Sequence, residues 1–299
     1  MIPMPGTIGG AKIIFNTTGT NKYSVGKQAT LDMFDQIKIG IVGIGFVGGA
    51  IKYSMDHSYD LVLVDSDPSR STHSFDDLFK CRGIFVCVPS PQSEDGKCDT
   101  SILEGVLEKL KDYTGVIISK TTAPPDVYER LNQIYPNLIH APEFLTAANA
   151  NLDYVNGNFA IVGGRVTAYI SEAVQLIKLG QRDLKNIHTC TIGEASMAKY
   201  IINTFLATKV IFMNEMAQLA EASGLRWDTI RNLIALDERR VGNSHTQVPG
   251  PDGQYGFGGA CFPKDTAALL RYADQLDIPL NVLDAAVKKN TLLRLTEPK

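Results

Sequence analysis

The chain has 299 residues, of which 44% are hydrophobic and 20% are charged, a mixture typical of globular proteins with a substantial core. The formal net charge of -3 indicates neither nucleic acid nor an anionic membrane as a partner, and no apolar run approaches the roughly 20 residues of a membrane span. The five cysteines are scattered without CxxC spacing, so we expect no disulfide framework and no metal site, and a reducing cytoplasmic location fits.

The first half of the chain predicts an α/β domain. Residues 1–35 have weak periodicity and lack a secretory signal, so we expect an N-terminal extension with one strand near residues 13–15. From residue 37 onward, short β-branched runs alternate with helical stretches, a pattern that predicts a Rossmann-type, doubly wound parallel sheet over residues 36–190. The expected strands lie within residues 38–45, 61–67, 83–90, 115–122, 137–144 and 158–164.

The second half, residues 191–299, reads as a mostly α-helical central domain. Residues 194–223 contain neither proline nor glycine, which predicts one helix about 45 Å long, ended by Gly224. Further helices are expected within residues 227–240, 265–277 and 281–294. The long helix carries more apolar surface than a small domain covers, so we expect a homodimer formed through Ile201, Leu206, Phe212 and Met216.

A dinucleotide fingerprint follows the first expected strand. Gly43, Gly45 and Gly48 form a GxGxxG that opens a helix, and Asp65 ends the next strand. The glycines allow a tight turn, approach of a pyrophosphate and close helix packing, while Asp65 can accept hydrogen bonds from a ribose. Asp65 favours NAD over NADP because its charge would repel the extra phosphate of NADP, although the nearby Arg70 could accommodate that phosphate. The alternative is a glycine-rich turn without a ligand.

Four polar residues are candidates for the chemistry. Lys199 and Asn203 are four residues apart in the long helix and share one apolar face. Burying a lysine and an amide there costs free energy unless they bind a partner or a ligand. The alternative is a lysine that reaches solvent beside a solvated amide. Thr122 and Glu143 end two strands and therefore face the crevice at the carboxyl edge of the sheet. The alternative for both is a cap of a turn or helix.

The stretch YGFGGACFPKD carries the most distinctive candidate. Residues 249–259 contain five glycines and two prolines and are expected to form a loop. Pro263 fits the first turn of a helix, so Cys261 is expected just before a helix N-terminus, with Lys264 and Asp265 beside it. A thiol with a neighbouring acid suits covalent acyl chemistry. The alternative is an inert cysteine in a packed loop.

Together these motifs resemble the UDP-glucose / GDP-mannose dehydrogenase family over residues 37–292. The resemblance rests on KIGIVGIGFVGGA, VDSDP, VCVPSPQSEDGKCD, SKTTAPP, APEFL, EASMAKYIINTFLATKVIFMNEMAQLAE, DERRVG and GFGGACFPKD. It implies oxidation of the primary alcohol of a nucleotide sugar to a carboxylate with two NAD, of the UDP-glucose to UDP-glucuronate type. It also implies a helical domain that dimerises through its long helix.

The resemblance assigns roles to individual residues. Cys261 would trap an aldehyde as a thiohemiacetal that becomes a thioester, and Asp265 would position or activate the water that hydrolyses it. Lys199 and Asn203 would stabilise the oxyanion, while Thr122 and Glu143 would hold the water or base. The implied cofactor contacts are Gly43, Gly45, Phe46, Val47, Gly48, Asp65, Arg70, Val88, Pro89, Thr122 and Lys264. The implied substrate contacts are Phe144, Leu145, Lys199, Asn203, Phe257, Gly258 and, across the dimer, Arg240.

Two departures from the family pattern leave alternatives open. Ala147 stands where the family usually has a second acid, and the chain ends at Lys299, before the further α/β domain that grips the nucleotide in the family. Either that domain lies on another polypeptide, or the substrate is held without it, or the protein is degenerate. The alternative functions are a two-electron 3-hydroxyacid-type dehydrogenase, which needs no cysteine, and an NAD-binding relative that does not turn over.

Overall fold

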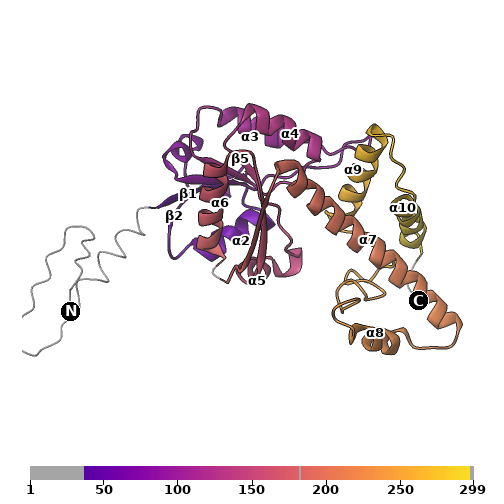
Figure 1. Cartoon of the computed structure of the whole chain (residues 1–299). Helices are drawn as coiled ribbons and strands as arrows, with labels where there is room; N and C mark the ends of the chain where they lie inside the picture. The colour runs from indigo at the N-terminus through magenta and orange to yellow at the C-terminus, as the bar shows by residue number, and fades with distance from the viewer. Residues whose placement is uncertain (1–36, 182, 297–299) are drawn as a thin grey trace, which may run out of the picture.

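The computed structural model describes residues 37–181 and 183–296 (Figure 1). The expected N-terminal extension, residues 1–35, therefore lies outside the described part of the chain. Within that part, the chain forms a sheet covered by helices and a group of helices arranged along one long helix.

The sheet has seven strands in the order β2-β1-β3-β4-β5-β6-β7. Strands β1 to β5 are parallel, which confirms the doubly wound α/β class. The expected all-parallel sheet is corrected at one edge, where β6 pairs antiparallel with β5 and parallel with β7. The strands are β1 Lys38–Val42, β2 Asp60–Val64, β3 Gly83–Val86, β4 Val116–Ser119, β5 Leu138–His140, β6 Phe159–Gly163 and β7 Asn186–Cys190.

Strand β7 was not among the expected strands. It reads NIHTC, and all five side chains are exposed or only half-buried. An edge strand of this kind lacks the apolar run that signals a buried strand, and its pairing with β6 is not visible in local sequence.

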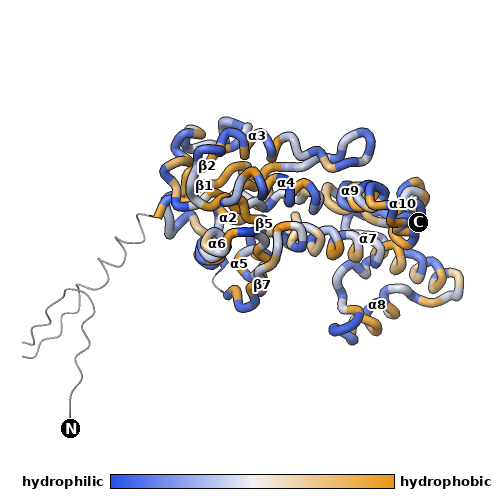
Figure 2. The backbone as a smooth tube through the Cα atoms, turned by 45° about the horizontal axis from the view of Figure 1, so that its top comes forward, coloured by the Kyte–Doolittle hydropathy of each residue, from blue (hydrophilic) through white to orange (hydrophobic). Residues whose placement is uncertain are grey.

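Two hydrophobic cores occupy the two faces of the sheet. Ile39 and Ile41 of β1 face α2, α5 and α6, whereas Ile84 and Val86 of β3 face α3 and α4. In Figure 2 the tube around β1 and β2 is orange, in keeping with this burial on both faces. These helices are α2 Phe46–Met55, α3 Ser101–Lys109, α4 Pro125–Ile134, α5 Ala150–Val155 and α6 Thr167–Gly180, with short 3-10 turns at Pro68–Arg70, Phe75–Lys80 and Ala147–Asn149.

The long helix α7, Ile192–Ala222, confirms the longest expected element. Thr191 and Glu194 form a capping box at its start, and Gly224 follows its end with a φ of 70°. Helices α9 (Phe262–Gln275) and α10 (Asn281–Arg294) pack along α7, and α8 (Trp227–Ala235) lies near its far end (Figure 1). Among the described helices, none combines the length and apolarity needed to cross a membrane.

Hydrogen bonds join α7 to the sheet region. The Ser196 hydroxyl donates to the carbonyl of Ala123 at 2.6 Å, and the Gly193 amide donates to Glu129 Oε1 at 3.0 Å. Strand β7 ends at Cys190, just before α7 begins. The division of the chain into domains of residues 36–190 and 191–299 stays a prediction.

The adjacent glycines of α2 predict opposite effects on stability. In Gly48→Ala the new methyl group would overlap the carbonyl oxygen of Gly43, so we expect the free energy of unfolding to fall by about 1–3 kcal/mol. In Gly49→Ala no atom lies within 4 Å of the methyl group, so better helix propensity should raise that free energy by up to about 1 kcal/mol. Urea denaturation of both variants measures the difference, and equal effects would contradict the close packing of Gly48.

Candidate active site

The strand order reverses between β1 and β3, which is the point where doubly wound sheets bind their ligands. Gly43 follows β1 with a φ of 88°, and a side chain there would collide with the carbonyl of Cys87. By contrast, a Cβ on Gly45 would meet no atom within 4 Å. Gly43 and Gly48 are therefore required by the fold itself, whereas the space at Gly45 is free for a ligand at the N-terminus of α2.

A cavity of about 770 Å³ lies over this glycine loop. Its lining contains one charged side chain, Arg70, and is otherwise neutral. A positive side chain and the free N–H groups of a helix terminus suit the diphosphate of a dinucleotide. The lining residues are Ile44, Gly45, Phe46, Gly49, Arg70 and the segment Ala147, Ala148, Asn149, Ala150, Asn151 and Leu152.

Asp65 lies at the end of β2 beside this loop. Burial opposes its ionisation, but N–H groups of Asp67 and Ile44 hydrogen-bond the carboxylate at 2.8 and 2.5 Å and hold its pKa below the ordinary value. Asp65 Oδ1 also accepts from the Ser66 hydroxyl at 3.5 Å, whereas Oδ2 keeps a lone pair that a ribose hydroxyl can use. The Arg70 side chain donates to the Ile44 carbonyl at 3.4 Å, at the rim of the same loop.

The other expected cofactor contacts differ in exposure. Phe46 and Pro89 are exposed at the surface, whereas Val47 and Val88 pack against the two cores of the sheet. The side chains of Val47 and Val88 therefore serve packing, so a cofactor would contact these two residues through their backbone atoms.

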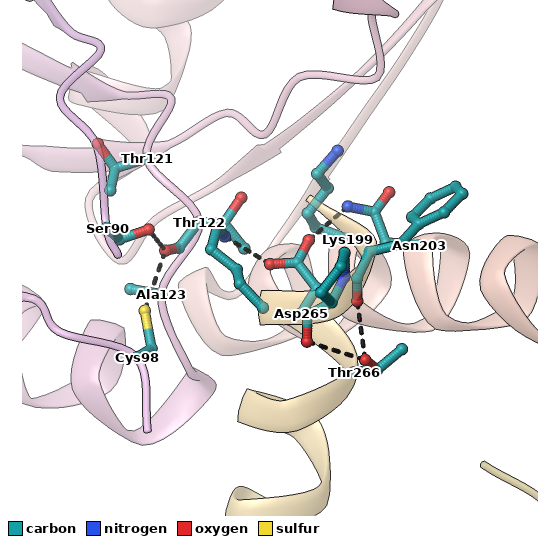
Figure 3. Close-up of polar contacts among 12 residues, drawn as sticks. Ser90, Cys98, Thr121, Thr122, Ala123, Lys199, Asn203, Asp265 and Thr266 are labelled. Carbon is teal, nitrogen blue, oxygen red and sulfur yellow. Dashed lines mark hydrogen bonds and ion pairs between the residues drawn. The ribbon is translucent and has the colours of Figure 1, made fainter. Parts of the chain in front are cut away.

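Helices α7 and α9 bring a second group of expected residues together (Figure 3). Asp265 is 1% exposed, and its carboxylate accepts a hydrogen bond from Asn203 Nδ2 at 2.5 Å. Lys264 Nζ pairs with the other carboxylate oxygen at 2.5 Å. A buried carboxylate needs such partners, so the two helices are fixed to each other at this point.

Lys199 lies one turn before Asn203 and reaches toward β5. Its Nζ donates to the backbone carbonyl of Glu143 at 2.5 Å and lies 5.0 Å from the centre of the Phe144 ring. Burial lowers the pKa of the Lys199 ammonium, although the acidic groups around it, Asp265 first, act in the opposite direction. The ammonium retains N–H groups beyond its bond to Glu143, so it can donate to a bound oxygen.

Cys261 is the N-cap residue of α9, as expected, and its side chain is exposed. The other four cysteines are buried or half-buried. Thr122 does not cap α4, because that helix begins at Pro125 with Pro124 as its N-cap. Instead, the Thr122 carbonyl accepts from the Ser90 hydroxyl at 2.6 Å and from the Cys98 thiol at 3.5 Å (Figure 3).

Sequence reasoning missed Lys120, which directly follows β4. Its Nζ pairs with Glu143 Oε2 at 3.2 Å, and its side chain is only 3% exposed. The other carboxylate oxygen of Glu143 accepts from the Phe144 amide at 3.0 Å. The position of Lys120 at the carboxyl end of a buried strand could have identified it, because a buried lysine is destabilising unless it has a charged or hydrogen-bonding partner.

Four expected substrate contacts have other neighbours. Arg240 is exposed and pairs with Asp237 at 2.7 Å. Phe257 is 4% exposed, inside the core between α7 and α10, and Leu145 packs against the core of the sheet. Gly258 lies against the guanidinium of Arg294. Their contact with a substrate stays a prediction.

Sequence comparison identifies what these two groups of residues resemble. Models of the UDP-glucose/GDP-mannose dehydrogenase family match residues 69–178 with the NAD-binding domain and residues 193–292 with the central domain. The matched segments make up more than two thirds of the chain. The match to an NAD-binding domain, together with the cavity over the glycine loop, confirms NAD as the expected cofactor.

Relatives and solved structures agree with this match. A UDP-glucose 6-dehydrogenase of Rickettsia prowazekii is 30% identical over 77% of this chain and 54% of its own length. One from Pseudomonas aeruginosa is 31% identical over 69% of this chain and 48% of its own length. The chain thus spans about half the length of these relatives. A UDP-glucose dehydrogenase structure from Pyrobaculum islandicum superposes with a TM-score of 0.73 at 22% identity, over 87% of this chain and 69% of its own, which shows the fold.

Removal of the buried lysine should be costly. In Lys120→Met the Glu143 carboxylate loses its ionic partner in a buried setting, so we expect the free energy of unfolding to fall by about 3 kcal/mol. Lys80→Met is the matched control, because it breaks the exposed ion pair with Asp77 and should change stability little. Urea denaturation tests both, and a Lys120→Met variant as stable as Lys80→Met would refute the buried pair.

A buried histidine predicts a loss of stability in acid. Burial lowers the pKa of His140 from 6.5 to about 3, and no partner occupies its Nε2 among the described residues. Below pH 6.5 the unfolded chain takes up a proton that the folded chain refuses, so stability falls as the pH drops toward 3. Between pH 7 and pH 5 wild type should lose about 2 kcal/mol more than His140→Asn. Urea denaturation at both pH values checks this, and identical losses would rule it out.

Proposed function

Because the chain belongs to the UDP-glucose/GDP-mannose dehydrogenase family, we propose that it oxidises the primary alcohol of a nucleotide sugar of the UDP-glucose type to a carboxylate. The overall change is R–CH₂OH + H₂O + 2 NAD⁺ → R–COO⁻ + 2 NADH + 3 H⁺. The observation that carries the proposal is the convergence of Lys199, Asn203 and Asp265 beside the exposed thiol of Cys261.

The first oxidation requires that a proton leave the substrate hydroxyl. Bound NAD supplies a hydride acceptor in each of the two oxidations. Lys199 and Asn203 donate hydrogen bonds to the oxygen on which negative charge develops, and their burial strengthens this interaction. Thr122 and Glu143 hold the water or base that takes the proton.

The second oxidation is covalent. The sulfur of Cys261 adds to the aldehyde carbon, which forms a C–S bond and a thiohemiacetal, and its oxidation leaves a thioester. Water held by Asp265 then adds to the thioester carbon, the C–S bond breaks, and the carboxylate leaves as the thiol is restored. Asp265 is fixed for this task because Asn203 and Lys264 hold its two oxygens.

A second copy of the chain belongs to the proposal. Of the residues expected at the dimer interface, Ile201 and Phe212 are exposed, whereas Leu206 and Met216 are half-buried. The exposed apolar side chains of α7 form a stripe along the helix, made of Ile201, Phe205, Phe212 and Leu219. A homodimer through this stripe would cover it, and the resemblance to the family assigns the exposed Arg240 of one protomer to the sugar pocket of the other. Sedimentation as a monomer at micromolar concentration would contradict the dimer.

Ala147 favours one alternative, a relative that binds NAD without turnover. This residue lines the cavity over the glycine loop, so the carboxylate usual in the family would be missing beside the cofactor. A two-electron hydroxyacid dehydrogenase is the other alternative. Counting the NADH formed per substrate distinguishes both alternatives from the proposal. The relative without turnover yields none, and the hydroxyacid dehydrogenase yields one.

The proposal predicts two NADH for each UDP-glucose consumed in the presence of NAD. Cys261→Ser should lower NADH release about a hundredfold or more, because no thioester forms, and should leave the NAD dissociation constant unchanged. Cys190→Ser, in edge strand β7, is the matched control and should keep full activity. If the protein binds NAD but forms no NADH with any nucleotide sugar, the proposal is wrong. If Cys261→Ser still produces the acid, Cys261 is not the nucleophile.

A further inference from the structure

Two side chains of α10 hold the glycine-rich loop that precedes Cys261. Asn290 Oδ1 accepts from the Phe257 amide at 2.7 Å, and Asn290 Nδ2 donates to the Phe257 carbonyl at 3.1 Å. One amide side chain thus satisfies both backbone groups of a buried residue, as a neighbouring strand would.

Arg294, one turn later on α10, spreads its guanidinium over the same loop. Its Nε donates to the Phe257 carbonyl at 2.9 Å, and its Nη1 pairs with Asp252 at 2.7 Å. Its Nη2 lies 3.5 Å from the Gly256 carbonyl. The planar fork of arginine is suited to several fixed acceptors at once, which a lysine cannot reproduce.

A third contact comes from α7. The Gly256 amide donates to Asn214 Oδ1 at 3.0 Å, while Asn214 Nδ2 is bound to the Val210 carbonyl of its own helix at 2.8 Å. We name Asn214, Asn290 and Arg294 the loop clamp. The clamp ties residues 256 and 257 to both α7 and α10.

The clamp also accounts for two of the glycines. Gly256 has a φ of 72°, and a Cβ there would overlap Asn290 Oδ1. A Cβ on Gly258 would lie 2.5 Å from Arg294 Nη2. Gly259 is different, because it is exposed and a Cβ there would meet no atom within 4 Å. Gly256 and Gly258 therefore serve the clamp, and only Gly259 leaves open space next to the thiol.

The clamped segment lies directly before the proposed nucleophile. The Phe257 ring packs edge-on against Phe262, the first residue of α9, with ring centres 6.1 Å apart. The backbone from Gly258 to Cys261 therefore spans two fixed points. We propose that Asn290 and Arg294 are positioning residues that set where the Cys261 sulfur lies relative to Lys199 and Asp265. This inference rests on the proposed function, in which Cys261 is the nucleophile.

The first test is Asn290→Ala in the full chain. We expect faster hydrogen exchange of the amides of residues 256–258, measured by mass spectrometry of the peptide that contains them. With UDP-glucose, kcat should fall about tenfold to a hundredfold, since small displacements of a reacting group are costly, while the KM for NAD stays unchanged. A role confined to fold stability would leave kcat of the folded protein unaltered.

A second readout needs no turnover. Cys261 is the exposed cysteine at the N-terminus of α9, so iodoacetamide should label it before the others. In Asn290→Ala the sulfur should spend less time at the helix terminus, and its alkylation should be several-fold slower. Arg294→Lys keeps the charge beside Asp252 but loses the fork, so it should show the same changes to a smaller extent.

Lys288→Ala is the matched control. It removes an exposed ion pair with Asp284 on the same helix and should alter neither loop exchange, nor kcat, nor alkylation. The proposal is overturned if the loop amides of Asn290→Ala exchange faster with unchanged kcat and alkylation, or if all three quantities match wild type. If wild type yields no NADH, the proposed function fails and the alkylation rate alone decides the clamp. If Asn290→Ala does not fold, Arg294→Lys decides by the same measurements.

Discussion

The buried carboxylate of Asp265 is the constraint on which the rest of the site depends. A charge that is 1% exposed is tolerable only with close partners, and Asn203 and Lys264 supply them from two directions. Lys264 belongs to α9 itself, so the bond from Asn203 is the one that fixes the start of α9 against α7. Because Cys261 caps α9 and Lys199 lies one turn before Asn203, this contact sets the thiol and the ammonium on the same side of the crevice.

The sheet contributes a second buried charge pair at the other wall of the site. Lys120 follows β4, Glu143 follows β5, and the parallel order of these strands brings their carboxyl ends together. Lys199 joins the two walls through the Glu143 carbonyl. These contacts connect α7 to the carboxyl ends of β4 and β5, and α7 in turn connects the sheet to the helices that carry the proposed reaction centre.

The glycines of the chain separate into two kinds by what surrounds them. Gly43, Gly48, Gly256 and Gly258 are required because neighbouring protein atoms leave no room for a Cβ. Gly45 and Gly259 border open space, one at the N-terminus of α2 and the other beside Cys261. Open space alone does not mark a ligand site, because Gly105 and Gly224 are equally open, and Gly259 has a φ of 76° that favours glycine whatever surrounds it. Gly45 points to a ligand because it also lines the cavity over the glycine loop.

Local sequence determined the elements whose signals are short-range: the buried strands β1 to β6, the ends of α7 and the turn of the GxGxxG. It also identified the residue types of the site, since Lys199, Asn203, Cys261 and Asp265 stand out in their immediate contexts. Tertiary structure alone decided the polar edge strand β7, the antiparallel pairing of β6 with β5, the partner of Lys120 and the clamp on Phe257. Each of these depends on contacts between distant residues, such as Asn290 with Phe257, and periodicity within one segment carries no record of such contacts.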